Sequence, residues 1–246
     1  MKKIVLLLLI CTSFFYTKAQ DNSEKSNSHL KKSFNLNNRP GDHFMLQLTG
    51  DGWSGMPDSI KSHKKGFSRG VGFYFMFDKV FKTSPQFSLG IGVGASSSSI
   101  FFNKMEVDLK SKTEKLPFLA VDSTNHFKKY KMATSYLEVP LEFRYTSNPE
   151  NYNKSWKAAI GLKIGTLVNA HTKGKTMLDK NDSPIGSYTQ KINSKTYING
   201  TRFAVTVRVG YGIISLYGSY GLSNILKDGV GPEMKPFQVG IAISGL

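Results

Sequence analysis

The chain has 246 residues, of which 39% are hydrophobic and 23 are glycine, so its length allows one large domain or two small ones. The only cysteine is Cys11, and a chain that loses its N-terminal segment can form neither disulfides nor thiolate metal sites. Lysine and arginine total 33 against 17 for aspartate and glutamate, and the net charge of +16 favours acidic partners, either nucleic acid or anionic lipid surfaces.

The N-terminus has the pattern of a secretory signal peptide. Lysines at residues 2–3 precede an apolar run over residues 4–10, and Thr17 and Ala19 supply small residues before a cleavage point. The run is shorter than the about 20 apolar residues that a membrane-spanning helix needs. We therefore predict a signal peptide at residues 1–19. Export makes nucleic acid the weaker class of partner, and we expect none.

The rest of the chain changes character at residue 42. Residues 20–41 are polar and rich in Asn, Ser and Lys, which predicts a flexible periplasmic lead-in. From there the hydrophobic pattern has period 2, the repeat of strands with two unlike faces. Residues 42–246 are expected to form one domain with eight strands, at about 42–50, 69–78, 86–102, 132–146, 155–171, 198–210, 213–222 and 236–246.

Each predicted strand has one apolar face and one face of glycine, serine or charged residues. In the strand at 132–146, the apolar face carries Leu137, Val139, Leu141 and Phe143. The opposite face of the same strand carries Glu138, Glu142 and Arg144. A membrane barrel turns the apolar face outward, whereas a soluble β-protein buries it. Alternation alone does not separate the two arrangements.

The connections favour the membrane barrel. The gaps after the second, fourth and sixth strands are short, and those after the first, third and fifth are long, at 51–68, 103–131 and 172–197. Short periplasmic turns, long outer loops, an even number of strands and aromatic girdles are typical of outer-membrane barrels. Two girdles are predicted, with Phe44, Tyr145, Trp156 and Tyr211 near the periplasmic ends and Phe101, Phe102, Tyr197, Tyr220 and Phe237 near the outer ends. We predict an all-β fold: an eight-stranded antiparallel up-and-down transmembrane β-barrel in the outer membrane of a Gram-negative cell.

One heptapeptide resembles a known family. Residues 135–141, Ser-Tyr-Leu-Glu-Val-Pro-Leu, are similar to a strand of the PorT-type outer-membrane β-barrel family, whose shape is similar to the OmpA transmembrane barrel. The resemblance extends over about residues 42–246. It implies a scaffold or accessory role in secretion across the outer membrane, with a secretion-machinery or envelope protein as a partner.

No motif points to catalysis, a cofactor or a metal. Gly90, Gly92 and Gly94 are spaced by two and lack a following helix, so they are expected to make room inside a narrow barrel rather than to bind a nucleotide. The five histidines show no metal-ligand spacing, and no Gly-x-Ser-x-Gly motif is present. We expect no catalytic residue and no enzyme activity, although His126 and His171 would be the histidines to examine.

The polar phase of three neighbouring strands carries six charges. An eight-stranded barrel has an interior only wide enough for its own side chains, and isolated buried charges are costly. We therefore predict a network of lumen charges that either plugs the barrel with salt bridges or lines a narrow ion pathway. Its members are Glu138, Glu142, Arg144, Lys163, Arg202 and Arg208.

The three long outer loops have net charges of +1, +3 and +3, which favours outer-membrane lipid with anionic headgroups as a partner. The leading functional hypothesis is a non-catalytic barrel with a structural, binding or secretion-accessory role. A small outer-membrane channel is one alternative. A soluble periplasmic lipocalin-like carrier is another, and it would turn Glu138, Glu142 and Arg144 outward.

Overall fold

The computed structural model describes residues 43–245, so the predicted signal peptide at 1–19 and the lead-in at 20–41 lie outside the described residues. A short helix α2 (Asp58–Lys61) and a 3-10 turn η3 (Tyr152–Lys154) interrupt the β structure. Within residues 43–245, no helix has both the length and the apolar character needed to cross a membrane. The strands are β1 (Phe44–Ser54), β2 (Arg69–Val80), β3 (Phe87–Phe102), β4 (Met105–Val107), β5 (Phe118–Ala120), β6 (His126–Thr146), β7 (Trp156–Leu178), β8 (Pro184–Asn193), β9 (Thr201–Tyr211), β10 (Ile214–Gly221) and β11 (Lys235–Ser244).

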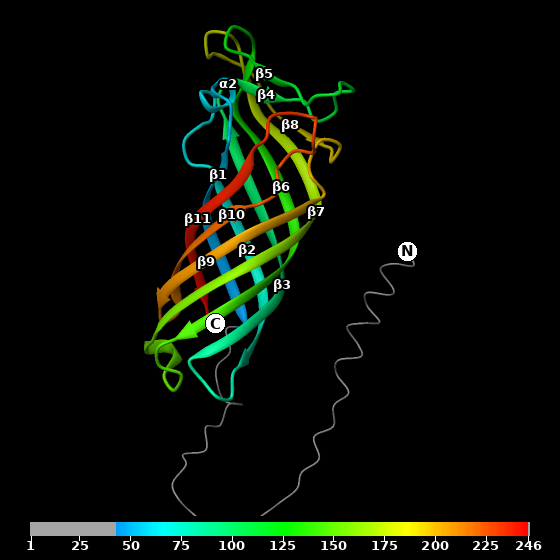
Figure 1. Ribbon diagram of the computed structural model, residues 1–246. Coiled ribbons are helices and arrows are strands. Elements are labelled where there is room, and N and C mark those ends of the chain that lie inside the picture. The colour runs from blue at the N-terminus through cyan, green and yellow to red at the C-terminus, as the bar shows by residue number, and fades with distance from the viewer. Residues whose placement is uncertain (1–42, 246) are drawn as a thin grey trace, which may run out of the picture. The chain divides into compact units, whose positions relative to one another are not determined.

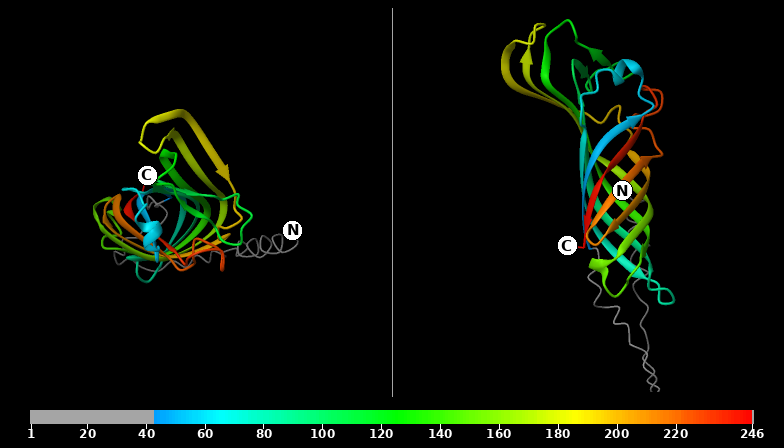
Figure 2. Two further views of the ribbon diagram at one scale, coloured as in Figure 1. Left: turned by 90° about the horizontal axis from the view of Figure 1, so that it is seen from above. Right: turned by 90° about the vertical axis from the view of Figure 1, so that its left-hand side faces the viewer.

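Eight of these strands form a closed antiparallel barrel (Figures 1 and 2). β1, β2, β3, β6, β7, β9, β10 and β11 pair in that order, and β11 pairs back with β1. Closure gives every strand two hydrogen-bonded neighbours, which leaves the barrel wall without an open edge. The predicted eight-stranded up-and-down barrel is confirmed.

The polar faces of the strands point into the barrel. On β6, Leu137 and Val139 are 53% and 45% exposed, whereas Glu138 and Glu142 are 1% and 2% exposed. The same alternation runs round the barrel, where Phe73 on β2 is 53% exposed and its neighbour Tyr74 is fully buried. The lipocalin-like carrier requires the opposite orientation of these faces, so that alternative is wrong.

Glycines on the inner phase make the room that the sequence suggested. A Cβ at Gly90 would lie 2.6 Å from Nε of Arg144, and a Cβ at Gly94 would overlap the ring of Tyr74. Both side chains cross the lumen beside β3 only because these positions carry no side chain. The glycine spacing therefore serves packing inside a narrow barrel.

The long outer connections contain more strand than predicted. β6 begins at His126 and β7 runs to Leu178, and β8 pairs with the outer part of β7. β4 and β5 form a separate hairpin within the predicted loop at 103–131. Period 2 continues in these extensions, but lysines replace the apolar residues on the outward phase, so the pattern resembled a polar loop.

A bulge shifts the phase of β7. Tyr136 on β6 pairs with Leu167, but Ser135 pairs with Asn169, so Val168 is an extra residue on β7. Beyond the bulge the even-numbered residues turn inward, and Ala170 is fully buried. Counting by two from Lys163 would place Asn169 on the inner face, and the bulge is the reason that it does not lie there.

An apolar cluster closes the outer end of the barrel, and we call it the outer cap. It gathers side chains from strand ends and from the connections between them, far apart along the chain. Phe102 and Tyr197, predicted in the outer aromatic girdle, are only 1% and 3% exposed because the cap covers them. The buried members of the cap are Trp53, Ile60, Ile100, Phe102, Met105, Val107, Leu109, Leu116, Phe127, Tyr130, Met132, Tyr136, Leu167, Ala170, Tyr197, Ile198, Ile225, Leu226 and Met234.

Candidate functional site: the charged lumen

The structure places all six predicted charged residues inside the barrel. Their exposed fractions lie between 1% for Glu138 and 4% for Arg202 and Arg208. They come from β6, β7 and β9, which are consecutive in the barrel wall, and residues two apart on a strand share a face. The side chains gather into two clusters, one around Glu138 and one around Glu142.

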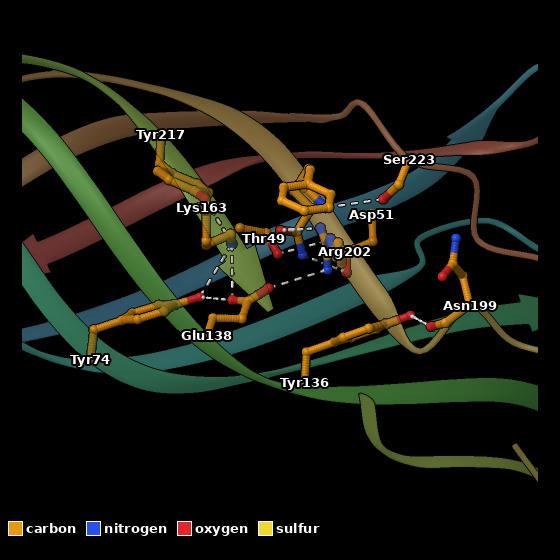
Figure 3. A network of polar contacts seen from close by, with 12 residues as sticks. Thr49, Asp51, Tyr74, Tyr136, Glu138, Lys163, Asn199, Arg202, Tyr217 and Ser223 are labelled. Carbon is orange, nitrogen blue, oxygen red and sulfur yellow. Dashed lines mark hydrogen bonds and ion pairs between the residues drawn. The ribbon is translucent and has the colours of Figure 1, made fainter. Parts of the chain in front are cut away.

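The first cluster centres on the Glu138 carboxylate (Figure 3). Lys163 Nζ lies 3.1 Å from Oε2 and Arg202 Nη1 lies 3.7 Å from Oε1. The Tyr74 hydroxyl donates a hydrogen bond of 2.5 Å to Oε2. One carboxylate thus holds a residue from β2, β7 and β9, and it joins opposite walls of the barrel.

The Lys163 ammonium is held by three oxygens. Besides the Glu138 contact, Nζ donates to the hydroxyls of Tyr74 at 3.3 Å and Tyr217 at 3.2 Å. An ammonium carries three donors, so these contacts can satisfy all of them without water. Tyr74 and Tyr217 are fully and 98% buried, and their rings lie 5.6 Å and 5.8 Å from Nζ.

Arg202 reaches a second carboxylate through an amide. Its Nη2 donates to Oε1 of Gln238 at 3.2 Å, and Nε2 of Gln238 donates to Oδ2 of Asp51 at 3.1 Å. The hydroxyl of Thr49 donates to the other Asp51 oxygen at 2.6 Å. The guanidinium also lies over the ring of Tyr136, with 5.6 Å between Cζ and the ring centroid. Because Tyr136 is a member of the outer cap, these contacts join the first cluster to the cap. Figure 3 shows Arg202 near Asp51 and Tyr136.

The second cluster centres on Glu142. Its Oε2 accepts hydrogen bonds from Nε of Arg144 at 2.9 Å and from Nη2 of Arg208 at 3.0 Å. Arg144 also faces Asp78, with Nη1 and Oδ1 3.6 Å apart, and Arg208 Nη1 donates to the Ser244 hydroxyl at 3.0 Å. This cluster ties β6 to β2, β9 and β11.

Sequence reasoning missed two carboxylates of the network, Asp51 and Asp78. The predicted six have four cations against two anions, and these two aspartates make the numbers equal. Asp51 continues the inner phase of Gln47 and Thr49, and Asp78 continues that of Tyr74. Extending the period-2 count to the strand ends would have found both. The charges of the two clusters therefore balance within the barrel wall.

The periplasmic end of the lumen is also filled. A cavity of about 10 Å³, lined by Arg144, Tyr152, Lys157 and Arg208 among others, is the size of a single water molecule. Lys157 places its ammonium 3.2 Å from the centroid of the Tyr152 ring. Tyr152 belongs to η3 in the β6–β7 turn, so this turn folds against the lumen.

Within residues 43–245, neither His126 nor His171 is hydrogen-bonded to a hydroxyl or thiol side chain. His63 contacts the Ser62 hydroxyl at 3.1 Å and the Asp122 carboxylate at 3.0 Å, and its side chain and those of its partners lie in the outer connections. His126 contacts Asp182, with Nε2 and Oδ1 2.9 Å apart, and the carbonyl of Thr124. His171 contacts the amide of Asn169 at 3.2 Å. Among residues 43–245 there is no group of three or more His, Cys, Asp or Glu side chains that could hold a metal ion.

The sequence model of the outer membrane protein beta-barrel domain matches residues 18–227, most of the chain. The chain belongs to this family. No curated protein matches it significantly. Family membership and the closed barrel place the protein in the outer membrane, where its apolar wall faces lipid. The short turns then lie on the periplasmic side, and the outer cap and the β8 extension lie outside.

Proposed function

We propose that this protein is a non-conducting, non-catalytic barrel that serves the outer membrane as a scaffold or binding platform. The observation that carries the proposal is the packed lumen. Glu138 and Glu142 each contact two cations, and their side chains are 0% and 3% exposed. An ion pathway needs connected water along the axis, and two charged layers between an apolar cap and the Tyr152 turn leave little space for it.

Conductance tests this proposal directly. The full mature chain is reconstituted into planar bilayers, and we expect little or no steady current from the wild type. Glu138→Ala is compared with Glu114→Ala, whose carboxylate lies exposed in the outer connection. Stable, ion-selective openings in the wild type that change with Glu138→Ala but not with Glu114→Ala would replace the proposal with the channel.

The finer role, an accessory in secretion, is supported by the resemblance of residues 135–141 to the PorT-type family. In that heptapeptide Tyr136 and Glu138 enter the lumen network, whereas Leu137 and Val139 face outward. The residues of the heptapeptide thus build the barrel itself, so the resemblance supports a shared fold more directly than a shared role in secretion.

Deletion of the gene tests the secretion role. We expect the set of secreted proteins to shrink while the envelope stays resistant to detergent, and the full chain should restore secretion. Unchanged secretion with a leaky envelope would instead assign a structural role.

A further inference from the structure

β6, β7 and β8 form a sheet that extends beyond the barrel wall (Figure 2). By their register, Lys129, Lys131, Lys173, Lys175 and Lys191 share the outward face of this sheet. The register pairs Lys129 with Lys175, Lys131 with Lys173, and Lys173 with Lys191. We call these five residues the lysine ladder. Directly opposed side chains in an antiparallel pair have Cβ atoms about 5 Å apart, and like charges there destabilise the sheet.

The lysine ladder has no carboxylate partner among residues 43–245. In the part of the chain that the structure describes, no carboxylate forms an ion pair with any of the five. Lys131 donates a hydrogen bond to the neutral hydroxyl of Ser99 at 3.1 Å. A further cation lies close by, because Arg69 and Lys131 both contact the ring of Phe101, at 5.3 Å and 5.8 Å from its centroid. The lumen charges are paired with carboxylates, whereas among residues 43–245 the ladder is not, which makes an anionic ligand a natural counter-charge for it.

The lysine ladder lies just above the lipid-facing wall. On β6 the outward phase runs from Val139 and Leu137 through Ser135, which bonds Ser97 at 3.1 Å, to Lys131. Four residues separate Ser135 from Lys131, which is about 13 Å along a strand, or about 10 Å in height at the usual tilt. A lysine stem can bend back toward the membrane surface over part of that distance.

The other face of the extension is already used. Ile192 packs against the outer cap, and the ring of Tyr188 stands edge-on to Phe127, with 6.1 Å between centroids. The ladder side therefore faces sideways, toward the neighbouring lipid rather than toward the barrel mouth. Lys129, Lys175 and Lys191 are exposed, and Lys131 and Lys173 are half-buried.

We propose that the lysine ladder binds the phosphate groups of outer-leaflet lipids. Strand spacing sets the lysines on a grid of roughly 5 Å by 7 Å, so one phosphate can accept hydrogen bonds from two or three ammonium groups. A headgroup with two phosphates would contact both rows of the ladder. Its negative charge offsets the repulsion that the register imposes, and it fixes the β8 extension against the membrane surface.

The test is lipid-dependent thermal stability of the full mature chain in neutral detergent. Bisphosphorylated lipid A is the probe, and dephosphorylated lipid A and inorganic phosphate are the comparison ligands. A ligand that binds only the folded state raises the melting temperature as its concentration rises. We expect the bisphosphorylated lipid to raise it, and added salt to weaken the effect.

Two ladder variants and one control make the test specific. Lys131→Gln with Lys173→Gln, and separately Lys129→Gln with Lys175→Gln, should need roughly ten times more lipid for half of the shift. Lys129→Gln with Lys175→Gln should not melt lower than the wild type without lipid, because it removes a directly opposed like-charge pair. Lys110→Gln with Lys112→Gln makes the same change of charge on exposed loop residues and should respond as the wild type does.

Three results would contradict binding of lipid phosphates by the lysine ladder. An equal shift with dephosphorylated lipid A would assign the effect to the acyl chains. A full shift with inorganic phosphate alone would make the ladder a small-anion site. Equal losses in the ladder and control variants would reduce it to nonspecific charge. Each of these outcomes overturns the proposal.

Discussion

Replacing Glu138 by glutamine should destabilise the barrel strongly, because it removes a buried charge without changing the shape of the side chain. Lys163 then keeps only the hydroxyls of Tyr74 and Tyr217, while Arg202 still reaches Asp51 through Gln238. The substitution therefore leaves only the Lys163 ammonium without a carboxylate, because Arg202 keeps its link to Asp51. The loss of one partner of a buried pair costs about 3–5 kcal/mol, and we expect Glu138→Gln to lie in that range.

Urea unfolding of the protein in lipid vesicles, followed by the fluorescence of Trp53 and Trp156, measures the loss. Glu114→Gln, on an exposed outer connection, should change the free energy of unfolding by less than about 0.5 kcal/mol. Glu138→Gln combined with Lys163→Met should cost less than the sum of the two single changes, since neither charge is left alone. Equal stability of Glu138→Gln and the wild type, or strict additivity in the double variant, would refute the pairing argument.

Three further predictions concern the wall, the lumen packing and the outer cap. Leu162 is 53% exposed on the outward face of β7, and Leu162→Arg should cost about 2–4 kcal/mol in vesicle unfolding if that residue faces the lipid midplane. A free energy of unfolding equal to that of the wild type would show that residue 162 faces water. Gly90→Val should push the Arg144 guanidinium away from Glu142 and lower the yield of heat-modifiable folded barrel on gels, whereas Gly200→Val, with open space around it, should fold normally. The hydrogen bond to Asp122 raises the pKa of His63, so this contact stabilises the cap at low pH and is lost as the pH rises through that raised pKa. Histidine NMR titration should show the raised pKa, and Asp122→Asn should lower it; no difference between the two proteins would contradict the assignment.

The barrel was predictable because one rule governs its whole wall. Backbone groups in lipid must be paired, so strands close into a barrel, and the side-chain period of 2 then fixes which residues face inward. β2 begins at residue 69, as predicted. β11 begins at Lys235, one residue before the predicted start at 236. The six lumen charges followed from the same count.

The partners of those charges were not predictable in the same way. Glu138 bonds Tyr74, 64 residues earlier in the chain, and Arg208 bonds Ser244. These contacts depend on the stagger of strands across the barrel, which alternation along one strand does not encode. Asp51 was missed for a simpler reason, since the predicted first strand stopped at residue 50 and β1 continues to Ser54.

The outer cap and the β8 extension were missed because their patterns do not repeat locally. The cap joins Trp53 at the end of β1, Phe102 at the end of β3 and Met234 just before β11, which lie far apart in the chain. β8 alternates Lys191 and Thr189 with Ile192 and Gln190, a weak contrast that resembles a polar loop until its pairing with β7 is known.

The same physical criterion separates the two charged regions of the molecule. In the two lumen clusters, four carboxylates accompany four cations, and burial makes their pairing important for the fold. On the outer wall, strand pairing brings lysines together, and within residues 43–245 no carboxylate forms an ion pair with them. A charge that is paired inside the protein contributes to the stability of the fold, and it is a poor candidate for binding an external ligand. A set of like charges that the fold assembles at a stability cost is the better place to look for a ligand, and its position beside the lipid wall indicates which ligand to test.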